Sequence, residues 1–379
     1  MTKIHSTLAC NLDKNILMAA LPLLAAEKVE AIEWSFDALF KTRNIPNWFV
    51  DLLRTYSQGQ ALIGHGIFFS LFSGRWSPEQ QQWLNHLKRI TKEFNFEHIT
   101  EHFGFMTGKN FHQGAPISVP YNERTLALGQ DRLKRMYEAC QRPVGLENLA
   151  IAYSTAEVQQ HGEFLEALLS PINGFIILDL HNFYCHLHNF EENFDRLIQS
   201  YPVHMVREIH ISGGSWQNSE WFDDKKVRRD THDDGVPEIV FELLEKVIPL
   251  CPNLKYVVLE QLGTGLKTDG QKTRFQKDFL RMDEIVQPSI PHKKTQNDFL
   301  PKQKIKFDEI VEDEVFHQQQ MQLSAILENA VDAASAEKLL MNSALAKTDW
   351  KVEEWKTHML DAVIQIAQQW KKGFQSPAN

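Results

Sequence analysis

The sequence has few cysteines, and none of them stands in a metal-binding pair. Cys10, Cys140, Cys185 and Cys251 are scattered over 379 residues without the CxxC spacing. This scarcity argues against a disulfide framework and against a zinc site built from thiolates. A nucleophilic pair of Cys185 with His186 is also disfavoured, because adjacent residues of a strand point to opposite faces.

Long apolar runs and an excess of positive charge are also missing. No stretch reaches the roughly 20 apolar residues that span a bilayer, and the N-terminus lacks the apolar core and cleavage site of a secretion signal. The formal net charge is −9, and we find no long basic patch. We therefore expect neither nucleic acid nor membrane as a partner, and we predict a cytoplasmic, globular protein.

What the sequence does contain is a repeated pattern of short apolar runs that end in a polar residue. The clearest run is 175–178, Phe-Ile-Ile-Leu, which is followed at once by Asp179 and the polar residues of 181–189. Runs of this length, bounded by glycine, are typical of buried parallel strands. We expect eight such strands, in or near residues 4–12, 29–36, 61–71, 96–100, 144–150, 175–178, 206–214 and 256–263.

These strands alternate with helical patterns, which predicts an α/β fold of the (β/α)8 TIM-barrel type. A doubly wound open sheet would normally carry a glycine-rich phosphate loop after its first strand, and the sequence has none there. We predict a catalytic, metal-binding barrel over residues 1–265, a helix and linker over 266–310, and a helical C-terminal extension over 311–379. Apolar stripes at helical spacing support the extension, which we interpret as an appendage or a lid.

Nine residues with metal-binding side chains stand at the ends of the predicted strands or in the loops after them. They are Glu33, His65, His102, Glu147, Asp179, His210, Asp230, His232 and Glu260. The C-terminal ends of barrel strands meet at one face, so these side chains are expected to converge. Packed carboxylates would repel one another unless cations supply compensating charge. The mixed nitrogen and oxygen donors suit iron, manganese or zinc, and their number suggests two or three ions.

Each of these residues also has an ordinary structural interpretation. His65 and His102 could be hydrogen-bonded core histidines, and Glu147 could cap a loop. Asp230 and His232 lie in a polar loop, where a solvated turn is the default. Asp179 is harder to dismiss, because a carboxylate after four apolar strand residues would be buried without a partner. The occurrence of such residues on successive strands favours a metal centre over these separate explanations.

The ordered motifs resemble one known family. They are HG at 65–66, EH at 101–102, LEN at 146–148, LDLHN at 178–182, EIHISGG at 208–214, DTH at 230–232 and LE at 259–260. In this order and spacing they resemble the multinuclear non-heme iron-dependent oxidative enzymes (MNIO family), over roughly residues 1–265. The resemblance implies a TIM barrel with two or three iron ions, Fe2+ or Fe3+. It also implies O2-dependent modification of a residue, often cysteine, in a ribosomally made precursor peptide.

The resemblance also implies roles for individual residues. The implied metal ligands are His65, His102, Glu147, Asp179, His210, Asp230, His232 and Glu260, with Glu147 bridging two ions. Further metal ligands or supporting residues are Glu33, Asn148, His181, Asn182 and Asn189. His181 stands where many relatives have asparagine, and the strand that carries Glu33 lacks the family's usual ending. No motif places the C-terminal extension, which could hold the peptide or a partner protein that recognises its leader.

Two other classes of function remain open at the level of sequence. One is a redox-silent, divalent-metal enzyme on the same barrel, either sugar isomerase-like or phosphodiesterase-like; the net charge disfavours a nuclease. The other is a binding or scaffold protein with a degenerate barrel, which we disfavour because every motif retains its ligand-type residues. Iron with O2 as co-substrate is the interpretation that the resemblance favours, because iron, unlike zinc, changes its redox state.

Overall fold

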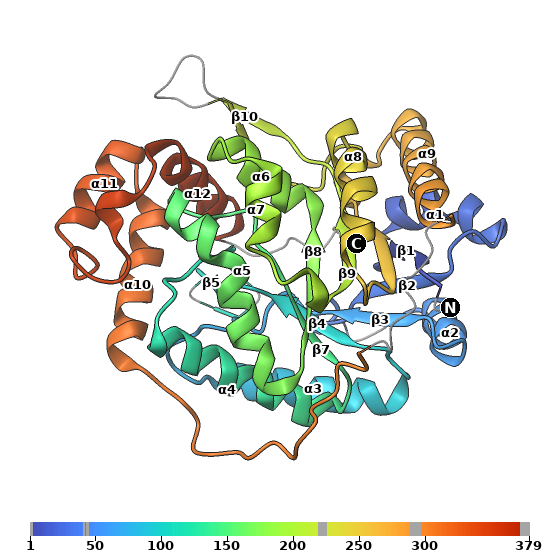
Figure 1. Cartoon of the computed structure of the whole chain (residues 1–379), viewed down its shortest axis with the longest axis horizontal. Coiled ribbons are helices and arrows are strands. Elements are labelled where there is room, and N and C mark those ends of the chain that lie inside the picture. Colours follow the sequence, from blue (N-terminus) through green and yellow to red (C-terminus); the bar gives the residue numbers. More distant parts are fainter. Residues whose placement is uncertain are drawn as a thin grey trace.

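Eight short strands pair in parallel and close into a barrel (Figure 1). The structure, a computed structural model, describes residues 3–40, 42, 45–108, 110–111, 113–218, 226–288 and 297–371. The order around the barrel is β1-β12-β9-β8-β7-β4-β3-β2. The strands are β1 (His5–Ala9), β2 (Ala31–Ser35), β3 (Leu62–His65), β4 (Ile99–His102), β7 (Val144–Glu147), β8 (Phe175–Asp179), β9 (Val206–Ile211) and β12 (Tyr256–Leu259). The predicted (β/α)8 barrel is confirmed.

Helices surround the barrel and connect its strands. They are α1 (Lys14–Ala25), α2 (Asn47–Gln58), α3 (Pro78–Glu93), α4 (Glu123–Cys140), α5 (Thr155–Leu169), α6 (Leu180–Asn189), α7 (Phe194–Gln199), α8 (Glu238–Val247) and α9 (Asp269–Val286). The start of α3 shows why a helix begins where it does. Ser77 and Gln80 form a reciprocal capping box, and Pro78 occupies the first turn, where its missing N–H costs nothing.

The strand register sets the layers inside the barrel. His102 on β4 lies beside Glu147 on β7, and Asp179 on β8 lies beside His210 on β9. Successive residues of a strand alternate between the two faces, so these polar residues point inward. Their apolar neighbours, such as Leu146 and Ile209, pack in the main hydrophobic core. The C-terminal ends of the strands therefore bring the predicted ligands to one mouth of the barrel.

The segment after β8 differs from the predicted loop. Helix α6 begins directly at Leu180, because the Asp179 carboxylate accepts a hydrogen bond from the Asn182 backbone N–H and caps the helix. The helix predicted at 190–200 is the short α7. Two hairpins were also not predicted from the sequence. They are β5 (Phe105–Met106) with β6 (Pro116–Ile117), and β10 (Trp216–Asn218) with β11 (Lys226–Arg228).

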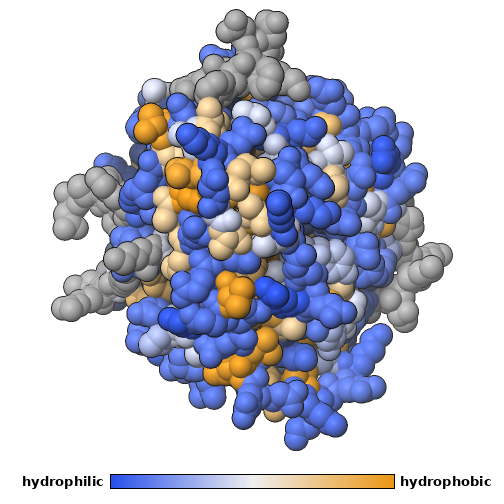
Figure 2. Space-filling view, turned by 90° about the vertical axis from the view of Figure 1, so that its left-hand side faces the viewer, coloured by the Kyte–Doolittle hydropathy of each residue, from blue (hydrophilic) through white to orange (hydrophobic). Residues whose placement is uncertain are grey.

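The C-terminal part of the chain folds into α10 (Glu314–Asn329), α11 (Ala333–Met341) and α12 (Thr357–Trp370). These helices lie together at one side of the barrel (Figure 1). Figure 2 shows that side of the molecule, which is largely hydrophilic with scattered apolar side chains. On the C-terminal helices α10 and α11 and the turn between them, Val315, Val331 and Leu339 are exposed. The predicted helical extension is thus confirmed, while the domain boundaries at 265 and 310 stay predictions.

The C-terminal helices contact the loops that follow barrel strands. The Asp313 N–H donates to the carbonyl of Gly74, after β3, and the Gly114 N–H, after β4, donates to the carbonyl of Trp370. The ring of Trp355 stacks on Tyr153, after β7, at 3.8 Å between centroids. The helices thus border the face of the barrel where the predicted ligands lie. Residues 289–296 of the predicted linker and the chain after 371 lie outside the described residues.

No helix among the described residues has the length and apolar character needed to cross a membrane.

Candidate metal centre

A first group of ligand-type side chains joins three neighbouring strands. His65 on β3, His102 on β4 and Glu147 on β7 place their ligand atoms within 4.8 Å of one another. The Glu147 Oε2 atom lies 3.2 Å from His65 Nε2 and 3.4 Å from His102 Nε2. The structure therefore brings together two imidazoles and one carboxylate, as predicted.

Hydrogen bonds on the opposite side of each ring fix the orientation of these two histidines. His65 Nδ1 lies 2.8 Å from the Thr100 hydroxyl, which itself donates to the carbonyl of Gly64. His65 Nδ1 must then donate, and the Nε2 lone pair is free to face Glu147. His102 Nδ1 donates to the carbonyl of Gly66 at 3.1 Å, with the same result. In their neutral forms both rings thus present the Nε2 lone pair to one point, as metal-ligating histidines do.

A second group shares Glu147 with the first. Glu147, Asp179, His210 and Glu260 also place their ligand atoms within 4.8 Å of one another. His210 Nδ1 lies 3.3 Å from Glu260 Oε2 and 3.9 Å from Glu147 Oε1. The two oxygens of Glu147 thus face different groups, which is the arrangement of a carboxylate that bridges two ions.

Asp230 and His232 adjoin these groups without belonging to either. His232 Nε2 lies 2.8 Å from Asp230, and His232 Nδ1 lies 3.5 Å from Glu260 Oε1. His181 contacts Asp230 through Nδ1 at 3.0 Å, and its Nε2 accepts a hydrogen bond from Arg228 at 2.9 Å. Both nitrogens of His181 are therefore engaged, so the structure favours a supporting role for His181 over direct metal binding.

The three asparagines named from the sequence differ in position. Asn148 accepts from the Asp179 N–H and donates to the Asp179 carbonyl, and Asn182 donates to the Asn148 carbonyl. These two residues connect the ends of β7 and β8 beneath the ligands. Asn189, named from the sequence as a possible metal or supporting residue, makes no such connection, and its role stays a prediction. It lies at the far end of α6, where it pairs with the backbone of Arg228.

A further group includes a residue that we did not single out in the sequence. Glu33 on β2 and His210 lie within 4.8 Å of Glu208, which is fully buried on β9. The signal for Glu208 was present, because Glu208 and His210 are two residues apart and must share one face of the strand. Two other buried carboxylates, Asp37 and Glu101, accept backbone N–H groups of the 67–69 segment, so they organise a loop.

Unpaired buried atoms show that the residues fit a cation. Both oxygens of Glu33, Glu147 Oε2, Asp179 Oδ2 and His210 Nδ1 are buried and have no hydrogen-bond partner. Such atoms are costly to bury unless they bind something. The donors are carboxylates and imidazoles, and the cysteines stand outside these groups. This donor set suits iron, manganese or zinc better than calcium or magnesium.

Burial and neighbouring charges shift the pKa values of the carboxylates and imidazoles in the site. Burial, reinforced by Asp230 and Glu147, raises the pKa of Asp179 well above its ordinary value, and burial raises the pKa of Glu33 to about 7. Burial lowers the pKa of His65, but the carboxylates of Glu33 and Glu147 outweigh burial and raise it to about 10. The carboxylates therefore need positive charge beside them, which metal ions would supply.

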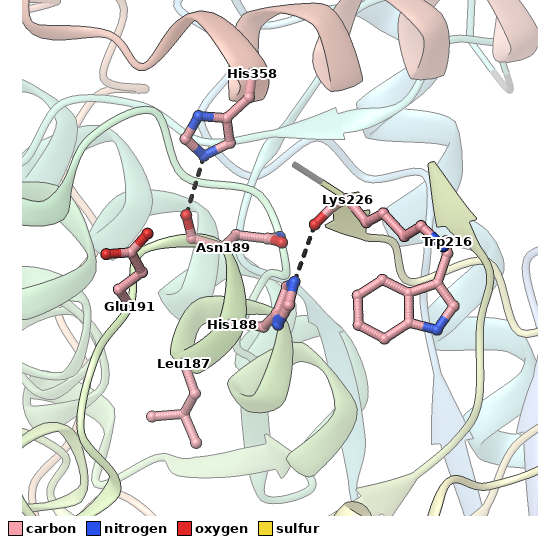
Figure 3. Close-up of a pocket in the computed structure, with 7 residues that line it drawn as sticks. All are labelled: Leu187, His188, Asn189, Glu191, Trp216, Lys226 and His358. Atoms are coloured by element: carbon pink, nitrogen blue, oxygen red, sulfur yellow. Dashed lines mark hydrogen bonds between the residues drawn. The ribbon is translucent and has the colours of Figure 1, made fainter. Parts of the chain in front are cut away.

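A pocket of about 710 Å³ lies between α6, the β10–β11 hairpin and α12 (Figure 3). Its lining is Leu187, His188, Asn189, Glu191, Trp216, Lys226 and His358. The Nε2 atom of His188 contacts the Lys226 carbonyl at 2.9 Å, so this hydrogen bond lies outside the metal groups. Strand β11 leaves this pocket and reaches Asp230 two residues after it ends. The pocket and the metal groups are thus joined by one short segment.

The closed barrel and the His, Asp and Glu groups at its mouth define the class: a TIM barrel with a candidate metal centre. Residues 29–262 match the family model described as RiPP precursor modification enzyme MbnB/TglH/ChrH. This match covers more than half of the chain, so the chain belongs to that family. The resemblance drawn from the motifs is confirmed.

Individual relatives are more distant. A UPF0276 protein of Acaryochloris marina is 29% identical over 165 residues, which are 42% of this chain and 57% of the relative. A UPF0276 protein of Alcanivorax borkumensis is 24% identical over 203 residues, 51% and 63% of the two chains. The chain thus spans less than two thirds of the length of these curated relatives. A xylose isomerase domain protein from Planctomyces limnophilus has the same fold, with a TM-score of 0.50 at 14% identity over 76% of this chain and 98% of that one.

Proposed function

We propose that this protein uses two or three iron ions and O2 to oxidise a residue, often cysteine in this family, of a ribosomally made precursor peptide. The observation that carries the proposal is the pair of ligand groups that share Glu147. Iron bound there would cycle between Fe2+ and Fe3+ and supply redox chemistry with O2 as the oxidant. The family supports the peptide substrate.

The ligand-type residues would form two or three separate metal positions. His65, His102 and Glu147 would hold one ion, and Glu147, Asp179, His210 and Glu260 a second. Asp230 and His232, beside Glu260, would complete a third position.

Side-chain exposure indicates the open side of this centre. His65, Glu147 and His210 are at most 3% exposed, whereas His102 is 20% and Glu260 17% exposed. The peptide would therefore approach past His102 and Glu260, while the deeper side excludes water.

The first experiment tests the metal and the oxidant together. Protein purified without oxygen is expected to contain two or three iron ions per chain. With a candidate precursor peptide, chosen from any short reading frame found beside the gene, it should consume O2 only when the peptide is present, and mass spectrometry should show the peptide altered. Protein that holds only zinc and changes a substrate without O2 uptake would contradict the proposal and favour the redox-silent enzyme.

The pocket beside α6 is a candidate for holding a part of the peptide away from the reacting residue. A row of rings connects it to Asp230: His181 to Tyr184 at 6.3 Å, Tyr184 to His188 at 6.2 Å, and His188 to Trp216 at 4.7 Å. Aromatic rings of this kind commonly anchor peptides. The C-terminal helices contribute His358 to the pocket and border the same mouth. A separate leader-recognition protein stays a prediction.

Trp216→Ala is expected to raise KM for the precursor peptide about ten-fold, equivalent to ~1.4 kcal/mol, and to leave kcat unchanged. The reason is that Trp216, 46% exposed, would contact the peptide without touching the metal. Steady-state kinetics and iron content measure the two effects. Trp48→Ala is the matched control, because Trp48 is 54% exposed on α2, outside the pocket. Equal KM values for both variants would show that the peptide does not bind in this pocket.

A further inference from the structure

Glu208 lies one layer deeper in the barrel than the metal groups. On β9 it points inward like His210, and its neighbours across the strands are Ile177 on β8 and Tyr256 on β12. His210 lies one step higher, beside Asp179. Both Glu208 and His210 are 0% exposed, so water cannot satisfy the carboxylate. A buried charge in this place requires protein partners.

Two imidazoles provide those partners. Glu208 Oε1 lies 3.0 Å from His210 Nε2, and Glu208 Oε2 lies 2.6 Å from His98 Nε2. Arg207 Nε donates to His98 Nδ1 at 3.3 Å. Because arginine can only donate, His98 Nδ1 accepts, and the hydrogen of the neutral ring must be on Nε2, aimed at Glu208. One oxygen of Glu208 is thus fixed by His98, and the other faces His210.

This arrangement decides which nitrogen of His210 can bind a metal. An Nε2–H that donates to Glu208 leaves the lone pair on Nδ1. That atom faces Glu260 and Glu147 and has no hydrogen-bond partner. A carboxylate behind a ligand histidine fixes its tautomer and makes it a stronger donor.

We propose that Glu208, held in place by His98, is the positioning residue of His210 and sets its Nδ1 atom toward the cation between Glu147 and Glu260. The inference rests on the metal centre of the proposed function and adds a role for two buried residues, Glu208 and His98. Neither contacts the peptide or the reacting atoms.

Glu33 offers a competing arrangement. Its Oε2 atom lies 3.2 Å from the same His210 Nε2 atom, and neither of its oxygens has a hydrogen-bond partner. A further ion held by Glu33, Glu208 and His210 would need a lone pair on Nε2 as well as on Nδ1, and the ring would then have to lose both hydrogens. The Glu208 contact to His98 favours the hydrogen-bonded arrangement. Glu33 is the residue that would accept the Nε2–H if Glu208 were removed.

Cobalt(II) is a suitable probe, because its visible spectrum reports the ligands around it. The full-length protein is stripped of metal and titrated with Co2+ in wild-type and Glu208→Gln forms. We expect one class of site to lose ten- to a hundred-fold in affinity in the variant, with a changed spectrum at that site. Glu157→Gln is the control, because this buried carboxylate holds the Tyr153 N–H outside the ligand groups. It should match wild type in both readouts.

A second variant keeps the test informative if Glu208→Gln folds poorly. Glu33→Gln alone should leave Co2+ stoichiometry unchanged, and the double variant should lose more affinity than the two single variants together, because Glu33 can no longer replace Glu208. A Glu208→Gln protein that folds and binds Co2+ like wild type would overturn the inference. So would the loss of one whole ion in Glu33→Gln, which would indicate the further ion instead. Wild-type protein that binds no Co2+ would refute the metal centre itself.

Discussion

Glu147→Gln is expected to abolish modification of the peptide and to remove more than one metal ion per chain. Glu147 is the residue that both compact groups share, with Oε2 facing His65 and His102 and Oε1 facing His210. An amide has no charge and only one acceptor atom, so it cannot bridge two cations. Elemental analysis after purification without oxygen, together with mass spectrometry of the peptide, measures both effects.

Comparison with Asp179→Asn separates the loss of metal in Glu147→Gln from a general loss of folding. Asp179→Asn should weaken only the second group and leave the His65 and His102 group able to bind. The Glu147→Gln protein should still fold, because the change removes a buried charge that lacks a hydrogen bond at Oε2. Circular dichroism tests that point. Retention of the full metal content by Glu147→Gln would show that the two groups do not share a ligand.

Removal of the metal should destabilise the protein strongly. Without a cation, the buried atoms of Glu33, Glu147, Asp179 and His210 described above lack partners, and their carboxylates repel one another. Addition of Fe2+ without oxygen, or of Co2+, should stabilise the chelator-treated protein by about 4 kcal/mol when free metal is ~1,000 times Kd. Thermal unfolding at increasing metal concentration measures this gain.

Two comparisons make the stability result specific. Mg2+ at the same concentration should raise Tm much less, because it prefers oxygen ligands and retains its water. Glu147→Gln should lose most of the gain from Co2+, whereas Trp48→Ala should keep it. A Tm that does not depend on transition metal would mean that the buried side chains satisfy one another, and that the centre is an ion-pair network.

Much of the site could be predicted from local pattern. The run at 175–178 identified β8, and the carboxylate directly after it, Asp179, had to lie at the C-terminal end of that strand. The same logic applied to His65, Glu147 and Glu260, because a polar residue that ends an apolar strand is a property of a few adjacent residues. The fold class followed from the alternation of such strands with helices.

Other parts of the site depended on distances across the barrel. Asn189 was named as a possible metal or supporting residue from the polar stretch 181–189, but it is the last residue of α6 and lies at the far end of that helix from Asp179. Glu208 passed unnoticed although it stands two residues before His210. The partner that gives Glu208 its importance, His98, lies 110 residues earlier in the chain, directly before β4.

The amino-acid sequence alone determined that this chain forms a (β/α)8 barrel and which segments carry its acidic and imidazole side chains, because strand alternation and strand ends are local features. Only the tertiary structure decided that Glu147 faces two groups, that His181 supports Asp230, and that His210 turns Nδ1 toward the centre. These outcomes depend on barrel closure and on the register between strands, which bring together atoms from distant parts of the chain.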